Sequence, residues 1–537
     1  MSEQPPTTNA PGEASIKPEF LLTEQVDNEA GSKRTSSSTT SDSEPKKRGA
    51  FAKRNKKNLL YIKSFDKLCT AVVNNQPCPR ENCKFSHDVD GFLAKKPSTL
   101  DLPCPFSPSH PDANPNPNPN NSCCSFGITC LGKDHVTPSN PPEKPFQTVH
   151  YDNHIEVETK FKLQKNKYFN KDELIPIYTE RSKIHVNSSQ STSWLAPLAT
   201  LGHAPFRKIC LDFDSDLFTC SEMVSSWSLM QGNASELGLL RKHADEKRFG
   251  VQLVAGNPLL AKKSACFLEE NVEFDWMSLN CACPIDVVTK RGMGSALMRN
   301  KSKIKGLVQG IRSVSNKFLS IKIRQGISDP TVHNWVGDVI DWGVDSIMMH
   351  GRTAQQRYSK KADYEYLANI NNILNRDQSN AALLVANGDI YLPKHLEQLN
   401  NLGISHYAVG RGALMKPWIF EELKTGQIID KTSSERFDLL RKFCNLGLSF
   451  WGSDIQGVET TRRYLLEWLS FYTRYVPVGI LQEVHELNLR APPFKGRNDM
   501  ESLLASSRVS DWISISEMLL GKVPENFTFV PKHRSKV

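Results

Sequence analysis

Two cysteines stand close together in the segment Asn280-Cys281-Ala282-Cys283-Pro284, directly after an apolar run at 274–279. Glycines follow the segment at 292 and 294, so the thiols sit on a glycine-flanked loop at the expected end of a strand. A thiol there can act as a nucleophile or as a proton donor. Because an unperturbed thiol has a pKa of about 8.5, it is mostly protonated at neutral pH, which favours the donor role. We take Cys283 as the candidate, whereas Cys266, in an expected helix, suits a packing role.

A second set of reactive side chains lies nearer the N-terminus. Its members follow the spacing Cys-x8-Cys-x4-Cys-x3-His and are Cys69, Cys78, Cys83 and His87. This is the ligand number and the mixture of thiol and imidazole that tetrahedral zinc takes. The surrounding region has too few apolar residues for a core, so zinc would supply the folding free energy. Phe85 between the last two ligands suits stacking on an unpaired RNA base.

A less regular cluster of the same kind follows. Its expected ligands are Cys104, Cys124, Cys130 and His135, with Cys123 as the alternative to Cys124. The first gap is stretched by a Pro- and Asn-rich insert at 108–121, which would have to loop out. The last three ligands keep finger-like gaps of five and four residues. We therefore expect a second zinc site.

The composition is that of a polar, intracellular protein. The chain has 537 residues, is 39% hydrophobic and carries a formal charge of +9, with a mean hydropathy of −0.44. It shows no apolar run long enough for a bilayer and no signal-peptide core, so its 13 cysteines favour metal ligation or catalysis over disulfides. Basic residues crowd 46–57, where they could hold phosphates, direct nuclear import or form a solvated tail.

The elements that must position Cys283 begin at Ser193. Short apolar runs then alternate with helical patterns, such as 259–270 and 332–342, as far as about residue 425. The expected strands are 193–198, 217–222, 249–254, 274–279, 319–324, 345–350, 382–386 and 405–410. Eight strand–helix pairs in about 230 residues predict a (β/α)8 TIM barrel of the α/β class, with a doubly wound open sheet as the rival.

Polar residues after several of these strands fall where a barrel has its active site. In Ile321-Lys322-Ile323-Arg324, the alternation turns both cations toward the lumen or its mouth, where they require an anionic partner. Gly388 follows the seventh strand, and Gly410-Arg411 follows the eighth. Glycine turns at these two strands are typical of phosphate binding through backbone N–H groups, to which Arg411 adds a fork of donors.

The chain therefore divides into six expected parts. These are a disordered basic tail (1–60), a finger region (61–136), a linker with one helix (137–188), the barrel (189–425), a helical domain (430–525) with helices at 433–450, 460–475 and 511–519, and a tail (526–537). A length of 537 residues is too great for a single core, which agrees with this division.

Taken in order, the barrel motifs resemble those of tRNA-dihydrouridine synthases. They are Asn-x-x-Cys-Pro-x-Asp, Lys-Ile-Arg, His-Gly-Arg-Thr-x-x-Gln-Arg-Tyr, Asn-Gly-Asp-Ile and Gly-Arg-Gly-Ala-x-x-x-Pro-Trp. The two CCCH clusters and the motifs beginning at Trp451 and Ile515 resemble the eukaryotic type 3 branch, over about residues 60–533. The resemblance implies that FMN, reduced by NADPH or NADH, converts uridine to 5,6-dihydrouridine at position 47 in the tRNA variable loop.

The resemblance also implies roles for single residues. Hydride would pass to C6 of the uracil, and Cys283 would protonate C5. Gln252 would bond the isoalloxazine ring and Lys322 would sit near its N1/O2 edge. The flavin contacts carried over in this way are Pro197, Leu198, Ala199, Gln252, Lys322, His350, Asn387, Gly388, Asp389, Gly410 and Arg411. The chain departs from the family pattern at Cys281, at Ala282, where the family has glycine, and at Gln325, where it has threonine.

The expected partners are tRNA, whose target base must be extruded into the pocket, FMN, the nicotinamide reductant and zinc. mRNA uridines remain an open second substrate. We expect a monomer without a membrane segment, in the cytoplasm, the nucleus or both. One rival is a flavin barrel acting on free pyrimidines, which leaves the fingers unexplained. The other is an RNA-binding protein with a retired barrel.

Overall fold

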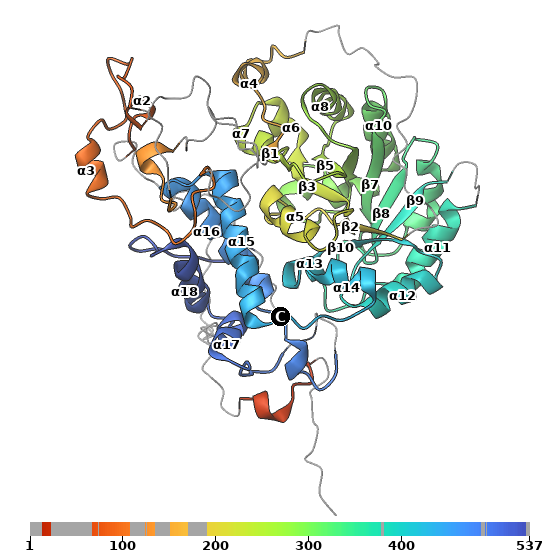
Figure 1. Cartoon of the computed structure of the whole chain (residues 1–537). Coiled ribbons are helices and arrows are strands. Elements are labelled where there is room, and N and C mark those ends of the chain that lie inside the picture. The colour runs from red at the N-terminus through yellow and green to blue at the C-terminus, as the bar shows by residue number, and fades with distance from the viewer. Residues whose placement is uncertain are drawn as a thin grey trace, which may run out of the picture.

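The computed structural model describes residues 13–22, 67–73, 75–107, 124, 126–134, 151–169, 191–376, 381–484, 489 and 491–532. Its centre is one sheet of eight strands in the order β2-β10-β9-β8-β7-β6-β5-β3, with every neighbouring pair parallel (Figure 1). The strands are β2 (Thr192–Leu195), β3 (Thr219–Ser225), β5 (Phe249–Val254), β6 (Trp276–Asn280), β7 (Phe318–Arg324), β8 (Ser346–His350), β9 (Leu383–Asn387) and β10 (His406–Val409). All eight expected strands are confirmed, with shifts only at their ends.

The two outer strands of this sheet meet and close it. Trp194 on β2 forms a parallel bridge with Phe218. The Leu195 N–H donates to the Phe218 carbonyl (2.9 Å), and the Phe218 N–H donates to the Ser193 carbonyl (3.1 Å). The fold is therefore a TIM barrel, and the doubly wound alternative is wrong.

Aromatic side chains fill one end of the lumen. Trp194 stacks on Phe218 with 3.9 Å between ring centroids and meets Trp276 edge-on at 4.9 Å. A Cβ atom at Gly250 would come within 2.2 Å of the Trp276 ring, so only glycine leaves room for this indole. The packed end confines any ligand to the opposite end, where the strands finish.

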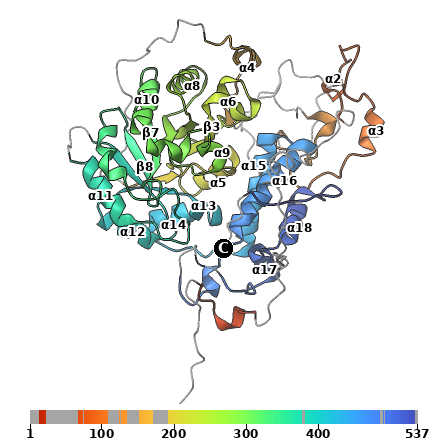
Figure 2. The same ribbon diagram turned by 180° about the vertical axis from the view of Figure 1, so that it is seen from behind.

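Helices cover the outside of the barrel (Figures 1 and 2). The main ones are α5 (Ala204–Leu211), α8 (Pro258–Asn271), α10 (Lys301–Arg312), α11 (Tyr364–Leu374), α12 (Pro393–Asn401), α13 (Arg411–Met415) and α14 (Ile419–Thr425). The expected helix at 259–270 is confirmed as α8. The one expected at 332–342 is wrong, because two 3-10 turns, η6 (Val332–Asn334) and η7 (Val336–Val339), occupy it. The apolar residues of this segment have helical spacing, but the backbone of Trp335, with φ −143°, lies outside the helical region. Gly337 further disfavours a helix, because glycine has a low helix propensity.

The C-terminal part is helical, as expected from the sequence. It contains α15 (Ser433–Trp451), α16 (Ile455–Tyr472), α17 (Asp499–Ala505) and α18 (Val509–Leu520). Thr432 and Glu435 form a capping box that starts α15. The Trp468 indole N–H donates to the Leu414 carbonyl of α13 (2.9 Å), which ties α16 to the barrel. Both views place α15 and α16 between the barrel and the finger region (Figures 1 and 2). Among the described residues, no helix is long and apolar enough to cross a membrane.

Part of the expected linker is packed into the protein. Residues 151–169 contain β1 (Tyr151–Asp152), which pairs antiparallel with β4 (Lys242–His243), and α4 (Val157–Gln164), the single helix expected there. Tyr151 is buried, packs edge-on against Phe450, and donates its hydroxyl to the Leu446 carbonyl of α15 (3.1 Å). This segment therefore joins the barrel to α15.

Residues 13–22, which we name the N-terminal strap, also pack against the protein, although the sequence places them in a disordered tail. Bridges join Ile16 to Leu481 and Leu21 to Phe494. The Lys17 N–H donates to the Ile480 carbonyl at 3.0 Å. Ile16 is buried against Ile480 and Leu481. Ten residues that cannot fold alone are thus ordered by pairing with a preformed edge.

We expect Ile16→Asp to detach the N-terminal strap. Burial of an isoleucine contributes about 1.5–3 kcal/mol, and an aspartate there would be a buried charge without a partner. Hydrogen exchange should then accelerate at the Lys17 and Gln482 amides, which bond across the contact. Leu22→Asp is the control, because Leu22 is 42% exposed. Equal protection in both variants would show that Ile16 does not hold the strap.

Candidate active site and metal centres

A cavity of about 940 Å³, including its open mouth, lies at the C-terminal ends of the barrel strands. Cys283 and every residue expected from the sequence to contact a flavin line it. Arg324 also lines it, as the strand alternation predicts. Further lining residues for which no role was expected include Met223, Asn280, Tyr358 and Tyr391. Asn280 and Tyr358 lie within two of the barrel motifs, whereas nothing in the local pattern marks Met223 or Tyr391.

The structure separates the two cysteines of the loop after β6. Cys281 is fully buried, donates its N–H to the Lys322 carbonyl (2.8 Å) and does not line the cavity. Cys283 is half-buried and lines it. Burial raises the pKa of Cys283 above its ordinary value, so its thiol carries a proton at neutral pH. Of the two, Cys283 can therefore offer a proton to a molecule in the cavity.

Two side chains hold the backbone of this loop. The Asn280 Oδ1 accepts from the N–H groups of Ala282 (3.1 Å) and Cys283 (3.0 Å). The Arg324 Nε donates to the Ala282 carbonyl (3.0 Å), and its Nη1 donates to the Thr353 carbonyl (3.0 Å). Ala282 has no positive φ, so alanine costs little where the family has glycine. The thiol is thus fixed by bonds from β6 and β7.

Asn280 also connects this loop to the neighbouring strand β5. Its Nδ2 donates to the Gln252 Oε1 (2.8 Å), and the Gln252 Nε2 donates to the Ser278 Oγ (3.1 Å). Gln252 and Asn280 are buried, so each amide is oriented by its partner rather than by water. A planar ligand that bonds to Gln252 would therefore contact the same hydrogen-bond network that orients Cys283.

The floor of the cavity is cationic. The Lys322 Nζ donates to the Asn387 Oδ1 (2.9 Å), which is a neutral partner. Burial, together with the charge of Arg324, lowers the pKa of Lys322 to about 7. The Nε2 of His350 lies 3.2 Å from the Arg352 Nη1, and burial among these cations keeps the pKa of His350 well below its ordinary value. A floor of this kind accommodates negative charge on a ligand.

Each of the turns after β9 and β10 contains a glycine, which leaves its own backbone uncovered by a side chain. Gly388 has φ +125°, and a Cβ atom there would come within 2.9 Å of the His350 ring, so only glycine fits. At Gly410 the nearest atom to such a Cβ is 3.9 Å away, on Ala196. Asp389 bridges Arg352 and Arg411, the latter at 2.8 Å. These residues fit a phosphate held by backbone N–H groups and Arg411.

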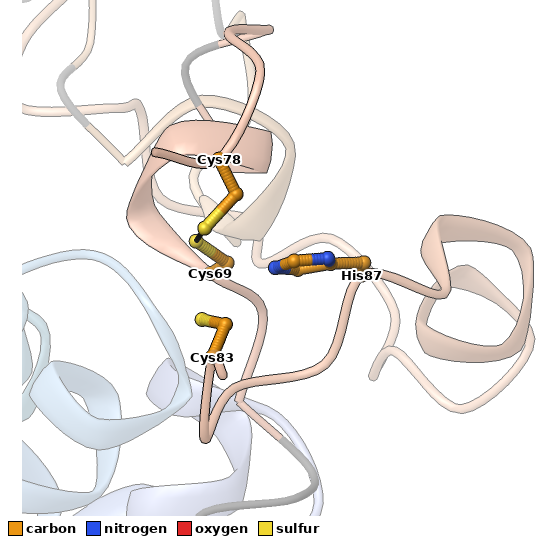
Figure 3. A group of neighbouring side chains, drawn as sticks. All are labelled: Cys69, Cys78, Cys83 and His87. Atoms are coloured by element: carbon orange, nitrogen blue, oxygen red, sulfur yellow. Dashed lines mark hydrogen bonds between the residues drawn. The ribbon is translucent and has the colours of Figure 1, made fainter. Parts of the chain in front are cut away.

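The first cysteine–histidine cluster is assembled as expected. Figure 3 shows the side chains of Cys69, Cys78, Cys83 and His87 pointing toward one another. Their ligand atoms all lie within 4.8 Å of each other, and the sulfurs of Cys69 and Cys78 are 3.5 Å apart. Two thiolates on one tetrahedral zinc lie about 3.8 Å apart, since each Zn–S bond is about 2.3 Å. The four groups therefore fit a single metal ion.

The second cluster is assembled as far as the structure describes it. The sulfurs of Cys104, Cys124 and Cys130 form one group, with 3.6 Å between those of Cys130 and Cys104. His135 and Cys123 lie outside the described residues. The three thiols fit a metal ion, and Cys124 occupies the position for which it was preferred.

Comparison with known proteins shows to which family this chain belongs. The profile of the family described as dihydrouridine synthase (Dus) matches residues 194–465, about half of the chain. A Xenopus laevis protein named tRNA-dihydrouridine(47) synthase [NAD(P)(+)]-like is 35% identical, over 93% of this chain and 84% of that protein. The chain belongs to the dihydrouridine synthase family.

Other relatives in the family extend the match in different ways. The Candida albicans tRNA-dihydrouridine(47) synthase [NAD(P)(+)] is 34% identical over 98% of this chain and 95% of that protein. A Xenopus tropicalis relative is 45% identical, over 64% of this chain and only 53% of that protein. This last match therefore spans about half of its relative. Membership confirms an oxidoreductase with the TIM-barrel catalytic domain of dihydrouridine synthases.

Proposed function

We propose that this chain reduces uridine to 5,6-dihydrouridine in tRNA, at position 47 of the variable loop. The single observation that carries the proposal is the placement of Cys283, whose protonated thiol faces the cavity lined by the predicted flavin contacts. A thiol there is suited to donating a proton to a carbon atom, and the cationic floor suits an anionic cofactor. The named relatives support position 47 and a nicotinamide reductant.

Residues from each wall of the cavity contribute to the proposed reaction. Bound FMN, reduced by NADPH or NADH, supplies the hydride for C6 of the uracil. Cys283 holds the proton for C5, and Asn280 and Arg324 fix the backbone that carries its thiol. Lys322 and Gln252 would face the flavin ring, and His350, Asn387 and Asp389 would complete this side. Pro197, Leu198 and Ala199 form the apolar wall, and Gly388, Gly410 and Arg411 would hold the phosphate.

The parts outside the barrel bring the RNA to this cavity. A uracil in folded tRNA must leave its stack to reach Cys283, so the tRNA must be held elsewhere while one base is extruded. We assign that task to the two CCCH clusters, with zinc as the metal, and to the helical domain at 430–525. The protein acts as a monomer in the cytoplasm, the nucleus or both, with mRNA uridines as a second substrate to be tested.

The test is a reconstituted reaction. Purified full-length protein is given FMN, NADPH and an unmodified tRNA transcript, and the RNA is digested and analysed by mass spectrometry. We expect a two-hydrogen mass gain at a single uridine of the variable loop. A protein that binds FMN but leaves every tRNA uridine unchanged would contradict the proposal. One that binds RNA but no FMN would be the retired RNA-binding barrel.

Flavin binding should take up a proton through Lys322. Because the pKa of this amine is about 7, it is largely neutral at pH 8. A reduced flavin, whose N1/O2 edge is anionic, would favour the charged form of this amine. Binding of reduced FMN at pH 8 should therefore take up about one proton and should tighten as the pH falls toward 7. Below that pH the amine is already charged and the uptake disappears.

Calorimetric titrations in buffers of different ionisation enthalpy measure this uptake. Lys322→Met should abolish it and should weaken binding about 10- to 100-fold, as for loss of one charged hydrogen bond. Lys424→Met is the control, because its side chain is 61% exposed. If the uptake at pH 8 persists in Lys322→Met, another group carries the proton.

A further inference from the structure

The two cysteine clusters differ in where they lie. The first is on a surface finger, in which His87 is exposed and Cys78 and Cys83 are half-buried. The second is inside an interface, where Cys104, Cys124 and Cys130 are at most 3% exposed. Both clusters have the same kinds of ligand, so ligand chemistry does not explain this difference in burial. The second cluster is buried because another part of the chain covers it.

Ser453, in the corner between α15 and α16, covers the second cluster. Its hydroxyl oxygen is 3.1 Å from the sulfur of Cys130 and 3.9 Å from that of Cys124. Ser453 is completely buried, and its carbonyl accepts the N–H of Leu131 at 2.8 Å. One residue of the helical domain therefore meets both the thiols and the backbone of the second cluster.

The residues beside Ser453 also allow the second cluster to approach this corner. Gly452 has φ +109°, and a Cβ atom there would come within 2.6 Å of the Phe126 ring, so glycine lets the finger approach. The Asp454 carboxylate accepts from the Gly457 N–H (2.8 Å) and starts α16. The corner is thus held on one side by the helix cap and on the other by the cluster.

We propose that the second cluster is a metal-dependent joint between the finger region and the helical domain, in which Ser453 donates a hydrogen bond to the metal-bound thiolate of Cys130. This rests on the metal binding proposed above. Metal binding releases the thiol proton and leaves a thiolate, which accepts a hydrogen bond more strongly than a thiol does. The metal therefore strengthens the contact with Ser453, and the contact in turn strengthens metal binding.

The joint fixes the first finger relative to the barrel. The second cluster is connected to the first by residues 88–103, and the Leu100 N–H donates to the Leu131 carbonyl beside the joint (2.7 Å). The segments that carry the two clusters also touch, since a Cβ atom at Gly127 would come within 2.6 Å of the Val73 carbonyl. The first cluster thus remains free to meet RNA, while the second maintains its position.

Zinc release tests the joint. We expect the full-length protein to carry two zinc equivalents by elemental analysis. Ser453→Ala should lower the zinc affinity of one site about 10- to 100-fold, seen as faster release of one equivalent to a colorimetric chelator. Ser470→Ala is the matched control, because Ser470 is a buried serine of α16 whose hydroxyl donates to the Glu467 carbonyl. Equal release from the two variants would overturn the inference and leave the metal assignment intact.

Hydrogen exchange supplies the second readout. Ser453→Ala and zinc removal should both accelerate exchange at the Leu131 amide, whose acceptor is the Ser453 carbonyl. Protection that is unchanged on zinc removal would also overturn the joint. A wild-type protein with one zinc equivalent, lost in Cys69→Ser, would instead refute metal at the second cluster and the inference with it.

Discussion

Cys283→Ala is expected to abolish uridine reduction while flavin binding is kept. The substitution removes the proton donor for C5, and a positioned general acid contributes about 10²- to 10⁴-fold to a rate. It leaves in place the flavin contacts on the other strands, so the purified variant should stay yellow with FMN. Single-turnover reduction of a tRNA transcript measures the loss, and the flavin absorption spectrum measures the retained binding.

Cys281→Ala is the matched control, because both thiols are on the same loop but only that of Cys283 reaches the cavity. Burial raises the pKa of Cys281 to about 12, so this thiol cannot lose its proton near neutral pH. We expect a small loss of stability and nearly unchanged reduction. If Cys281→Ala were inactive and Cys283→Ala active, Cys281 would be the proton donor and our assignment of Cys283 would be wrong.

The barrel and its cavity could be predicted because the informative patterns are local. Strand alternation alone turns Lys322 and Arg324 toward the lumen, and both line the cavity. Gly388 and Gly410 were visible as turns after strands seven and eight. What local patterns did not reveal is how these groups are oriented. The bonds from Asn280 and Arg324 to the Cys283 loop join separate strands, and only the folded barrel brings them together.

The features that the sequence did not predict have the same origin. The N-terminal strap has no apolar periodicity, and it is ordered by its contacts with Ile480, Leu481 and Phe494, more than 450 residues away in the chain. Tyr151 lies in a polar stretch and is buried because Phe450 of α15 and His243 of β4 pack on it. Serine, as at Ser453, is too common to mark a metal site without the fold. Each case depends on a partner that is distant in sequence.

Removing one partner of a buried ion pair behind the cavity wall is expected to destabilise the protein strongly. Arg207 of α5 and Glu246 are at most 1% exposed and form two bonds, of 2.6 and 2.9 Å. Arg207 also donates to the Gly202 carbonyl (2.6 Å), and the Gly202 N–H donates to the Leu198 carbonyl (3.1 Å). The pair thus supports the loop that forms the apolar wall of the flavin site.

Glu246→Ala should lower the free energy of unfolding by about 3–5 kcal/mol, because it leaves the Arg207 guanidinium buried without its counter-charge. Chemical denaturation followed by tryptophan fluorescence measures this loss, and flavin affinity should fall with it as the loop at 197–202 loosens. Arg207→Met in the same chain should restore much of the stability, since the unpaired charge is then gone. Glu158→Ala, which breaks the exposed pair with Lys162, should leave the midpoint unchanged. If Glu246→Ala behaved like Glu158→Ala, water would have to reach Arg207, and the wall of the flavin site would not depend on this pair.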